Sequence, residues 1–497
     1  MRSTAKNLPI VLLIVAFSSL LVACPKHLPE TDSAKFAPSS QESVMRTPGD
    51  LAPMKLEATH KKILQPEVID KDPLDEIAGR KNLALPDLVD IALRNSPETR
   101  ITWAEARAAA AQWGKSRSTY YPSLESNVGG VAGRIPQLQG GRSYFSADLA
   151  LTYLLLDFGG RSAKAEAARQ ALIAANWNHN QAIQDLLRDV PKAYYTYVGD
   201  LSKVTASETN LREARTTLAA TEERKSTGVG TIVDVLQAKA NKASVEVELV
   251  SNKGAAKIAK GSLATTVGWP ANTPFKLANA PQKIPLNKLG SNVDDLITDA
   301  KRNRAAIASS KASVKQKEAE LLEARTLPFP KVTGGGNTTW ERMRRNDSIA
   351  YYGTFNVEIP IFKGFEMRNS IREARASLAA ARAQLKLEEE QIIQEVWNAY
   401  NNFKTASEQL SASNTLLRSS KESYDASLAR YRKGAADIVE LLNSQTLLAS
   451  ARSQVIDSKM GLYISYAELI HAVGSQMDER FAPQVTIEEE DLGNENN

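Results

Sequence analysis

The chain has 497 residues, and its 62 lysine and arginine side chains are nearly balanced by 57 aspartate and glutamate side chains, which leaves a formal net charge of +5. This balance is too mild for a protein whose partner is nucleic acid, and the absence of a phosphate-binding loop, a nucleophile motif or metal-ligand spacing among its four histidines predicts no enzyme activity, cofactor or metal site. Only 6% of the residues are aromatic, whereas alanine, serine, lysine, glutamate and arginine dominate long stretches, which is typical of long helices.

The N-terminus predicts a lipoprotein signal peptide over residues 1–23. A short basic start leads into an apolar run over residues 8–21 that is too short to span a bilayer comfortably, and the run ends in Leu21-Val22-Ala23-Cys24. This ending resembles the bacterial lipobox, in which the signal peptidase cuts before the cysteine and the sulfur carries a diacylglycerol. We predict that Cys24, the single cysteine, is lipidated and anchors the protein to outer-membrane lipid. The alternative is a buried cysteine in an uncleaved anchor helix.

Residues 24–82 are predicted to be a lipidated tether, because prolines interrupt this stretch without any sustained hydrophobic period. At the other end, residues 477–497 contain the run Glu488-Glu489-Glu490-Asp491 and are predicted to be an acidic, solvated tail. The folded body is therefore expected between these two segments.

The body contains one unit twice, over residues 83–286 and 287–476. The matches keep a constant offset of 208 positions and then, after a two-residue contraction, of 206. Matching segments include Tyr121-Pro122-Ser123-Leu124 with Phe329-Pro330-Lys331-Val332, Ile232-Val233-Asp234-Val235-Leu236 with Ile438-Val439-Glu440-Leu441-Leu442, and Val267-Gly268 with Val473-Gly474. Because a repeat of roughly 200 residues far exceeds the solenoid periods of about 20 to 50 residues, each copy is expected to hold several elements of one pseudo-symmetric body.

Each repeat is predicted to run helix, strand, strand, long helix, reversal, helix. The first helix is expected over residues 86–118 and again over 293–325. The long helix is expected over 161–225 and 367–432, where apolar residues keep alternating steps of three and four, as in a coiled-coil seam. The two shorter helices of each repeat together have about the length of the long one, so we expect them to stack end to end beside it.

Alternating apolar and polar residues predict strands between the first helix and the long helix. The alternation extends over residues 145–155 and recurs over 349–359. A period of two over about ten residues matches a membrane strand with one face to lipid and one to water. Glycine-rich partner strands are expected at 124–131 and 332–340, and the connections 133–143 and 343–348 are predicted to be extracellular turns.

Two interpretations of these strands stay open. Alone, they would form ordinary soluble hairpins. In a membrane, four strands cannot close a barrel and an open edge cannot face lipid, so the membrane interpretation requires an oligomer. Three chains would supply twelve strands, and two would supply only eight.

The chain resembles the TolC family of outer-membrane efflux ducts over nearly all of residues 83–475. The resemblance lies in the order and spacing of the duplicated segments, which include Leu85-Pro86-Asp87-Leu88, Asn95-Ser96-Pro97-Glu98, Leu156-Asp157-Phe158-Gly159-Gly160-Arg161, Pro360-Ile361-Phe362-Lys363-Gly364, Val267-Gly268-Trp269-Pro270 and Val473-Gly474. It implies a mainly helical homotrimer, with a twelve-stranded transmembrane β-barrel on a long α-helical periplasmic tunnel. It also implies docking to a periplasmic adaptor (membrane fusion) protein and to an inner-membrane pump or ABC exporter.

Gly228 and Gly434 are predicted to end the long helices, because glycine readily adopts the left-handed conformation past a helix end. Together with Thr231 they mark the two reversals, which the resemblance assigns to adaptor docking. The apolar residues that follow are expected to begin the packing of the returning helices, namely Ile232, Val233, Leu236, Ile438, Val439 and Leu442.

In the family, acidic residues at the tip of the second repeat ring the closed tunnel mouth. The matching position here is Glu440, with Asp437 one turn before it, whereas Asn443 occupies the next acidic position. The sequence closest to the family's gate stretch contains Asp234 and lies in the first repeat, so the resemblance leaves open which ring forms the constriction. A three-fold ring of carboxylates would attract cations. The alternative is a solvated acid at a helix start, favoured by the helix dipole.

The predicted function is an outer-membrane channel that carries cargo from an inner-membrane pump across the periplasm and outer membrane. The alternative is a periplasmic coiled-coil lipoprotein, an adaptor or structural spacer without a pore, which the alternating strands and the two matched copies disfavour. The cargo stays open between small molecules, such as drugs or metals, and unfolded proteins of a type I system. The chain has Lys301-Arg302-Asn303-Arg304-Ala305 in place of the Arg-Arg-Pro-Asp-Ile stretch of the drug and metal branch.

Overall fold

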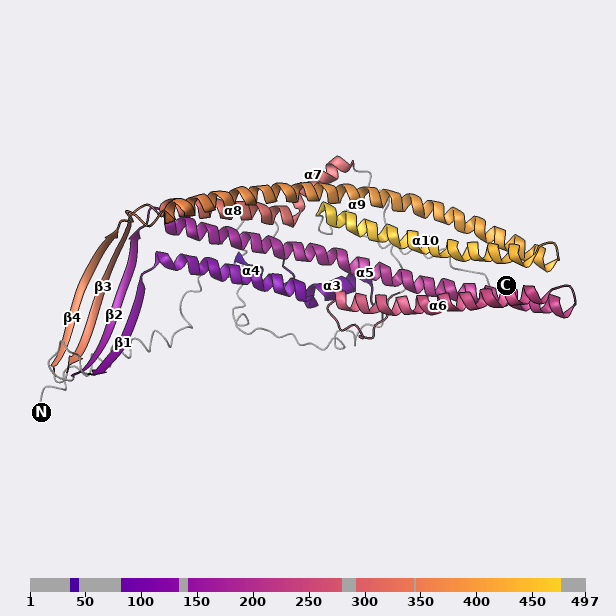
Figure 1. The fold of residues 1–497 in the computed structure, drawn as a ribbon, viewed down its shortest axis with the longest axis horizontal. Coiled ribbons are helices and arrows are strands. Elements are labelled where there is room, and N and C mark those ends of the chain that lie inside the picture. Colours follow the sequence, from indigo (N-terminus) through magenta and orange to yellow (C-terminus); the bar gives the residue numbers. More distant parts are fainter. Residues whose placement is uncertain (1–35, 44–81, 134–141, 279–291, 344–345, 475–497) are drawn as a thin grey trace. The chain divides into compact units, whose positions relative to one another are not determined.

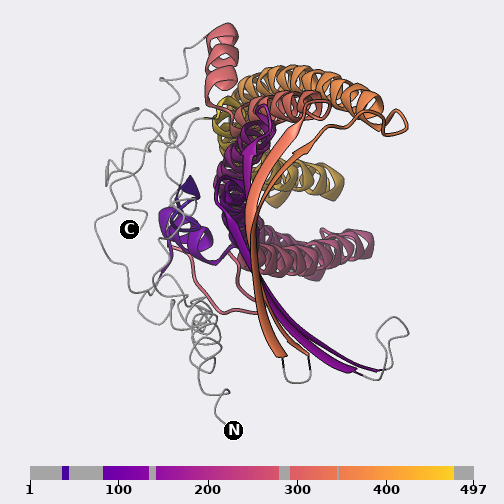
Figure 2. The same ribbon diagram turned by 90° about the vertical axis from the view of Figure 1, so that its left-hand side faces the viewer.

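The computed structural model describes residues 36–43, 82–133, 142–278, 292–343 and 346–474 (Figures 1 and 2). The predicted signal peptide, the predicted lipidation site Cys24 and the predicted tail 477–497 lie outside these residues. The chain divides into two compact units, each of which draws on both repeats. Within the described residues, the strand unit comprises 36–43, 102–133, 142–179, 306–343 and 346–387, and the reversal unit comprises 82–101, 180–278, 292–305 and 388–474.

The predicted order of helices and strands in each repeat is confirmed. The first repeat contains α3 (Leu85–Asn95), α4 (Pro97–Ser116), the short 3₁₀ helix η2 (Arg117–Tyr120), β1 (Ser123–Gly133), β2 (Arg142–Leu156), α5 (Gly160–Ser226) and α6 (Ile232–Thr266). The second repeat contains α7 (Val293–Asn303), α8 (Ala305–Thr326), β3 (Lys331–Met343), β4 (Asn346–Glu358), α9 (Glu366–Arg432) and α10 (Ile438–Val473). In this described part of the chain, no helix is both long enough and apolar enough to cross a membrane.

The first helix of each repeat is interrupted, and the prediction of one continuous helix over 86–118 was wrong. α3 ends at Asn95, and α4 begins at Pro97, which is tolerated at the first helical position because no hydrogen bond is lost there. Ser96 between them has φ −58 and ψ 123, outside the helical region. Steric contact with the following proline ring disfavours the helical conformation for this residue.

The second interruption, inside the predicted helix 293–325, has a different cause. Arg304 leaves the helical conformation with φ −70 and ψ 121. Its side chain is only 4% exposed, and its guanidinium donates to Glu395 Oε2 at 2.8 Å and to the carbonyl oxygen of His471 at 2.9 Å. The His471 ring in turn lies 2.7 Å from Asp185 Oδ1. These contacts hold the α7–α8 junction against α5, α9 and α10.

The strands of the strand unit form an antiparallel sheet in the order β1-β2-β3-β4, which Figure 2 shows as a curved layer. β2 of the first repeat pairs with β3 of the second, so the two predicted hairpins form one sheet. Gly335 permits this pairing, because a Cβ there would lie 2.5 Å from the carbonyl oxygen of Leu151. Within the described residues β1 and β4 have a neighbouring strand on one side only, so both edges present unpaired backbone groups.

One face of this sheet is apolar and exposed. Seven of the alternating residues predicted for that face are 42–83% exposed, namely Phe145, Leu151, Leu155, Ile349, Tyr351, Phe355 and Val357, whereas Ala147, Leu149 and Tyr153 are only partly exposed. A contiguous exposed apolar surface of this kind marks contact with lipid or with another protein chain.

The helices of the strand unit contact one another in the order α4, α5, α8, α9. Thr102 Oγ1 of α4 lies 3.0 Å from His179 Nδ1 of α5. Ser309 Oγ of α8 donates to Asn178 Oδ1 of α5 at 2.6 Å. α8 and α9 share an apolar cluster formed by Val314, Leu321 and Leu378.

A short segment of the predicted tether, residues 36–43, packs against α4 and α5, and we call it the strap. The Phe36 ring meets the Trp113 ring edge to face at 5.0 Å between centroids. Trp103 Nε1 donates to the carbonyl oxygen of Pro38 at 3.0 Å, and Asn176 Nδ2 donates to that of Phe36 at 2.7 Å. The chain is therefore docked here rather than free of the folded body.

In the reversal unit, each returning helix ends against the interrupted helix of its own repeat. α6 is followed by Gly268 (φ 88) and α10 by Gly474 (φ 73). A Cβ on Gly268 would lie 2.7 Å from the carbonyl oxygen of Asn95, and one on Gly474 would lie 2.9 Å from the backbone nitrogen of Arg304. The predicted end-to-end arrangement of the shorter helices is confirmed at these two contacts.

Candidate functional site at the helix reversals

Both long helices end in the same backbone motif. α5 is followed by Gly228 with φ 79, and α9 is followed by Gly434 with φ 77. The closing bonds run from Val229 N to Arg224 O (3.0 Å), Gly228 N to Lys225 O (3.1 Å), Ala435 N to Arg430 O (2.9 Å) and Gly434 N to Tyr431 O (3.0 Å). This Schellman pattern satisfies carbonyl groups that a helix end otherwise leaves unpaired. Both helices thus end at the predicted glycines.

In the first reversal, Thr231 and Asp234 form a reciprocal cap on α6. Thr231 Oγ1 accepts from Asp234 N at 3.1 Å, and Asp234 Oδ2 accepts from Thr231 N at 2.9 Å. This capping box satisfies two backbone donors at the helix start. Asp234 therefore acts as a capping acid in the single chain.

In the second reversal, Asp437 caps α10, and Glu440 turns back toward the end of α9. Asp437 Oδ1 accepts from Glu440 N at 2.7 Å. Glu440 Oε1 accepts from Arg430 Nη1 at 2.8 Å, and Arg430 also donates to the carbonyl oxygen of Ala435 at 3.1 Å. Asp437 thus matches the alternative interpretation of a helix-start acid, whereas Glu440 forms an ion pair that closes its own hairpin.

A contact between Arg224 and Tyr431 joins the ends of α5 and α9. The Arg224 guanidinium donates to the carbonyl oxygen of Tyr431 and lies 4.7 Å from the centroid of its ring, a cation–π distance. Tyr431 is 2% exposed, and this burial raises the pKa of its phenol against the opposing charge of Arg224. The contact therefore joins a permanent cation to a neutral ring.

Sequence analysis did not single out Arg224, and it placed Tyr431 only in the apolar seam predicted for the long helix 367–432. The repeat offset of 206 pairs Arg224 with Arg430 and Lys225 with Tyr431. The second of these pairs is not a conservative match, and this departure from the repeat was the available signal.

The first reversal exposes an apolar surface that we call the tip patch. Its members are 51–69% exposed, namely Val229, Ile232, Val233 and Leu236. The prediction that Ile232, Val233 and Leu236 begin the return packing was therefore wrong, and Val235 is buried instead. It was also wrong for Val439 of the second repeat, which is 49% exposed. In the second repeat, Ile438 is buried in one cluster with Tyr431. Lys225 stands at the position of Tyr431 in the first repeat, so Ile232 lacks the corresponding aromatic ring.

The model of the outer membrane efflux protein family matches residues 88–269 and 296–475. The chain is 29% identical over 383 residues to Protein CyaE of Bordetella pertussis, covering 75% of this chain and 80% of the relative. It is 23% identical over 414 residues to the probable efflux pump outer membrane protein TtgC of Pseudomonas putida, covering 79% and 83%. The solved structure of the outer membrane protein VceC from Vibrio cholerae aligns with a TM-score of 0.69 at 20% identity, covering 79% of this chain and 97% of that chain.

The two matched segments fall on the two repeats and take up more than half of the chain. The family is one of transport components and not of enzymes. It favours a channel over a coiled-coil spacer without a pore. The chain therefore belongs to the outer membrane efflux protein family, whose members are outer-membrane channels.

Proposed function

We propose that three copies of this chain close a twelve-stranded barrel in the outer membrane, continued by a helical tunnel in the periplasm. The observation that carries this proposal is the sheet of the strand unit. Its two edges are open within the described residues, and one of its faces is apolar and exposed. Because an open edge is not tolerated in lipid, each copy needs neighbours on both sides. Four strands per chain reach twelve with three copies and only eight with two.

The duct carries small molecules, such as drugs or metals, or unfolded proteins. An inner-membrane pump or ABC exporter delivers them. The name of the relative TtgC, a probable efflux pump outer membrane protein, supports a pump as the partner. Cys24 is acylated and holds the N-terminus in the membrane, and the two repeats, 83–286 and 287–476, form the duct.

A periplasmic adaptor docks at the reversals, around Gly228, Thr231 and Gly434. The tip patch supports this assignment, because its four apolar side chains are more than half exposed in the single chain. Exposed apolar groups gathered at one end of a helical hairpin are typical of a protein contact.

Carboxylates at the reversals form the gate of the tunnel. Asp437 and Glu440 of the second repeat, with Asp234 of the first, would repeat three times around the axis and attract cations. The contact of Arg224 with Tyr431 supports this assignment, because it holds the ends of the two long helices together where a gate would have to open.

The protein-only mass of the particle extracted from isolated outer membranes tests the proposal. We expect light scattering with detergent correction to give the mass of three chains. The matched control has a cleavable signal peptide and lacks the lipidated cysteine. If this control still needs detergent for extraction, the sheet, and not the lipid, holds the protein in the membrane. A monomer that leaves the membrane without detergent in this control would show that the strands are not embedded in the membrane.

A further inference from the structure

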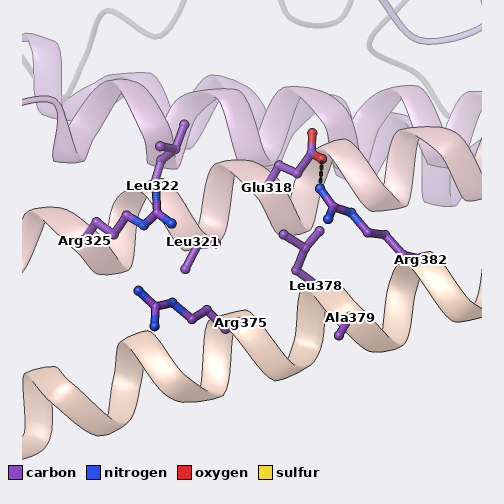
Figure 3. Close-up of a pocket in the computed structure, with 8 residues that line it drawn as sticks. All are labelled: Glu318, Leu321, Leu322, Arg325, Arg375, Leu378, Ala379 and Arg382. Atoms are coloured by element: carbon purple, nitrogen blue, oxygen red, sulfur yellow. Dashed lines mark hydrogen bonds and ion pairs between the residues drawn. The ribbon is translucent and has the colours of Figure 1, made fainter.

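The groove between α8 and α9 in the strand unit has an unbalanced charge. Apolar side chains from both helices line it, and its volume is ≈ 520 Å³. Figure 3 shows Arg325 of α8 and Arg375 of α9 extending into the space between the two helices. At the other end of the groove, Arg382 pairs with Glu318 at 2.8 Å. Among the residues that the structure describes, neither Arg325 nor Arg375 has an acidic partner.

Cationic side chains continue along α9 toward the strands. Arg368, Arg372, Arg375 and Arg382 follow one another at steps of four, three and seven residues, which places them on one face of the helix. A neighbouring groove shares Arg375 and is also lined by Lys363, Arg368 and Arg372. Because like charges on one helix face repel, an anion bound among them would be stabilising.

The same end of α9 has an apolar rim. Ile361, Phe362 and Phe365 are 91%, 71% and 64% exposed, and they line the neighbouring groove. They lie in the chain just after β4, which ends at Glu358. Aromatic and basic side chains gather in this way at the headgroup level of membranes, and basic pockets there bind anionic headgroups. The matching ligand therefore joins a phosphate to hydrocarbon chains.

We propose that Arg325 and Arg375 bind the phosphate of an anionic phospholipid from the periplasmic leaflet of the outer membrane. Its acyl chains lie against Ile361, Phe362 and Phe365. The proposal rests on the proposed function, since it requires the sheet to cross that membrane. A guanidinium binds phosphate through paired charge-assisted hydrogen bonds. Because the two arginines come from different helices, one bound phosphate would also fasten α8 to α9 next to the strands.

Native mass spectrometry tests this proposal, since one spectrum reports both the number of chains and the number of bound lipids. The full-length protein is placed in nanodiscs of phosphatidylcholine and phosphatidylglycerol in a ratio of about 4:1 and then released. We expect phosphatidylglycerol to be retained selectively by a particle of three chains. Each arginine removed should lower the retention of phosphatidylglycerol about tenfold, because a hydrogen bond to a charged group contributes roughly 1.5–3 kcal/mol. The double variant R325Q/R375Q should therefore retain the least phosphatidylglycerol. The matched control is R418Q, which removes an exposed arginine farther along α9.

Several results would overturn the proposal. Three-chain particles that retain both lipids equally, or an R325Q/R375Q variant that retains as much phosphatidylglycerol as R418Q, would exclude the lipid site while leaving the duct intact. Displacement of the lipid by inorganic phosphate at a similar concentration would indicate a general anion site. Loss of the three-chain mass in R325Q/R375Q alone would identify the groove as a contact between copies. A monomeric wild-type particle without bound lipid would contradict the lipid site and the proposed function together.

Discussion

Arg224 and Arg430 occupy the same position in the two repeats and make different bonds. Arg430 pairs with Glu440 of its own hairpin at 2.8 Å. The acid equivalent to Glu440 in the first repeat, Asp234, is held by the cap with Thr231, and Arg224 instead contacts the other hairpin. Within the described residues no cation pairs with Asp437, so it adds the uncompensated charge at the second reversal.

Removing the tip carboxylates should open the proposed gate. We expect the variant Asp437→Ser/Glu440→Gln to show a higher single-channel conductance and a weaker cation preference in planar bilayers, because the ring of charge and the bond to Arg430 are both lost. Serine at 437 still accepts a backbone hydrogen bond, so the helix cap is kept. The control Glu408→Gln removes an exposed acid of α9 away from the reversal. Conductance and selectivity equal to this control would rule out the gate assignment.

Glycines at the ends of α6 and α10 should be indispensable. Gly268→Ala or Gly474→Ala places a Cβ against backbone atoms at 2.7–2.9 Å and strains a residue with positive φ. We expect each to lower the free energy of unfolding by about 1–3 kcal/mol. The control Gly461→Ala lies inside α10, where a Cβ meets no atom within 4 Å, and should raise stability by roughly 0.5–1 kcal/mol. The melting temperatures of the three variants are compared by thermal unfolding in detergent. Equal melting temperatures for Gly474→Ala and Gly461→Ala would show that position 474 does not require glycine.

Among the elements, the strap lies beside a buried histidine, His179. Burial lowers the pKa of His179, against a smaller opposing effect from the backbone of Gln41. His179 lies completely buried between α4 and the strap, with its Nδ1 toward the Thr102 hydroxyl. A second proton on this ring would therefore be a buried charge without an acidic partner in the described region.

The docking of the strap should weaken on acidification. The unfolded chain takes up a proton on this histidine near pH 6.5, whereas the folded chain does so only at lower pH. The stability that His179 contributes is therefore complete above about pH 6.5 and is lost as pH falls through its lowered pKa. We expect protease cleavage within residues 36–43 to speed up at pH 5 relative to pH 7.5, after correction for protease activity on an unfolded substrate.

Two variants separate the contributions of this site. His179→Gln keeps a polar group toward Thr102 and should remove most of the pH dependence. Trp103→Phe removes the hydrogen bond to Pro38 but keeps an aromatic ring, and should speed cleavage at both pH values. The control Trp397→Phe changes a tryptophan that is 52% exposed on α9. Equal pH dependence in His179→Gln and wild type would exclude His179 as the titrating group.

The long elements were predictable because their periods extend over many residues. The predicted helices 161–225 and 367–432 agree with α5 and α9 to within one residue at each end. The first three predicted strands fall inside β1 to β3, and the fourth, 349–359, extends one residue past the end of β4. The interruptions were missed because Ser96 and Arg304 each remove one residue from a helical pattern that continues on both sides. Arg304 leaves the helix through contacts with Glu395 and His471, which are distant in the sequence.

At the candidate site, backbone roles were predictable and side-chain partners were not. The sequence indicated Gly228 and Gly434, because only glycine readily takes the left-handed conformation that ends these helices. The cap of Asp234 and the pairing of Glu440 depend on which nearby donor each acid meets. The contact of Arg224 with Tyr431 joins residues more than 200 positions apart, so local patterns could not reveal it.

At the scale of the whole molecule, the open edges of the sheet specify how copies meet. Disulfides between β1 of one copy and β4 of the next should therefore join three chains and no more. In a background without Cys24, Asn127→Cys is combined in turn with Ala350→Cys, Tyr352→Cys or Thr354→Cys, which sample the register between copies. Mild oxidation of membranes should give a ladder on denaturing gels that stops at three chains, because a closed ring leaves no free edge.

The single Asn127→Cys variant controls for random collision. It lacks the partner cysteine on β4 and should stay monomeric on the gel. A ladder that ends at two chains, or one that continues beyond three, would contradict the twelve-stranded barrel. A complete absence of cross-links at all three registers would place β1 and β4 apart in the assembled protein.

The pairing of β2 with β3 has a consequence for the order in which the chain is exported. Leu151 pairs with Gly336, so the central ladder of the sheet cannot form until the second repeat has crossed the inner membrane as far as the end of β3 at Met343. Contacts between residues so far apart in the sequence form slowly. The first repeat arrives in the periplasm with β2 exposed and without its partner, a state prone to aggregation. We therefore expect a periplasmic chaperone to hold the first repeat until β3 arrives.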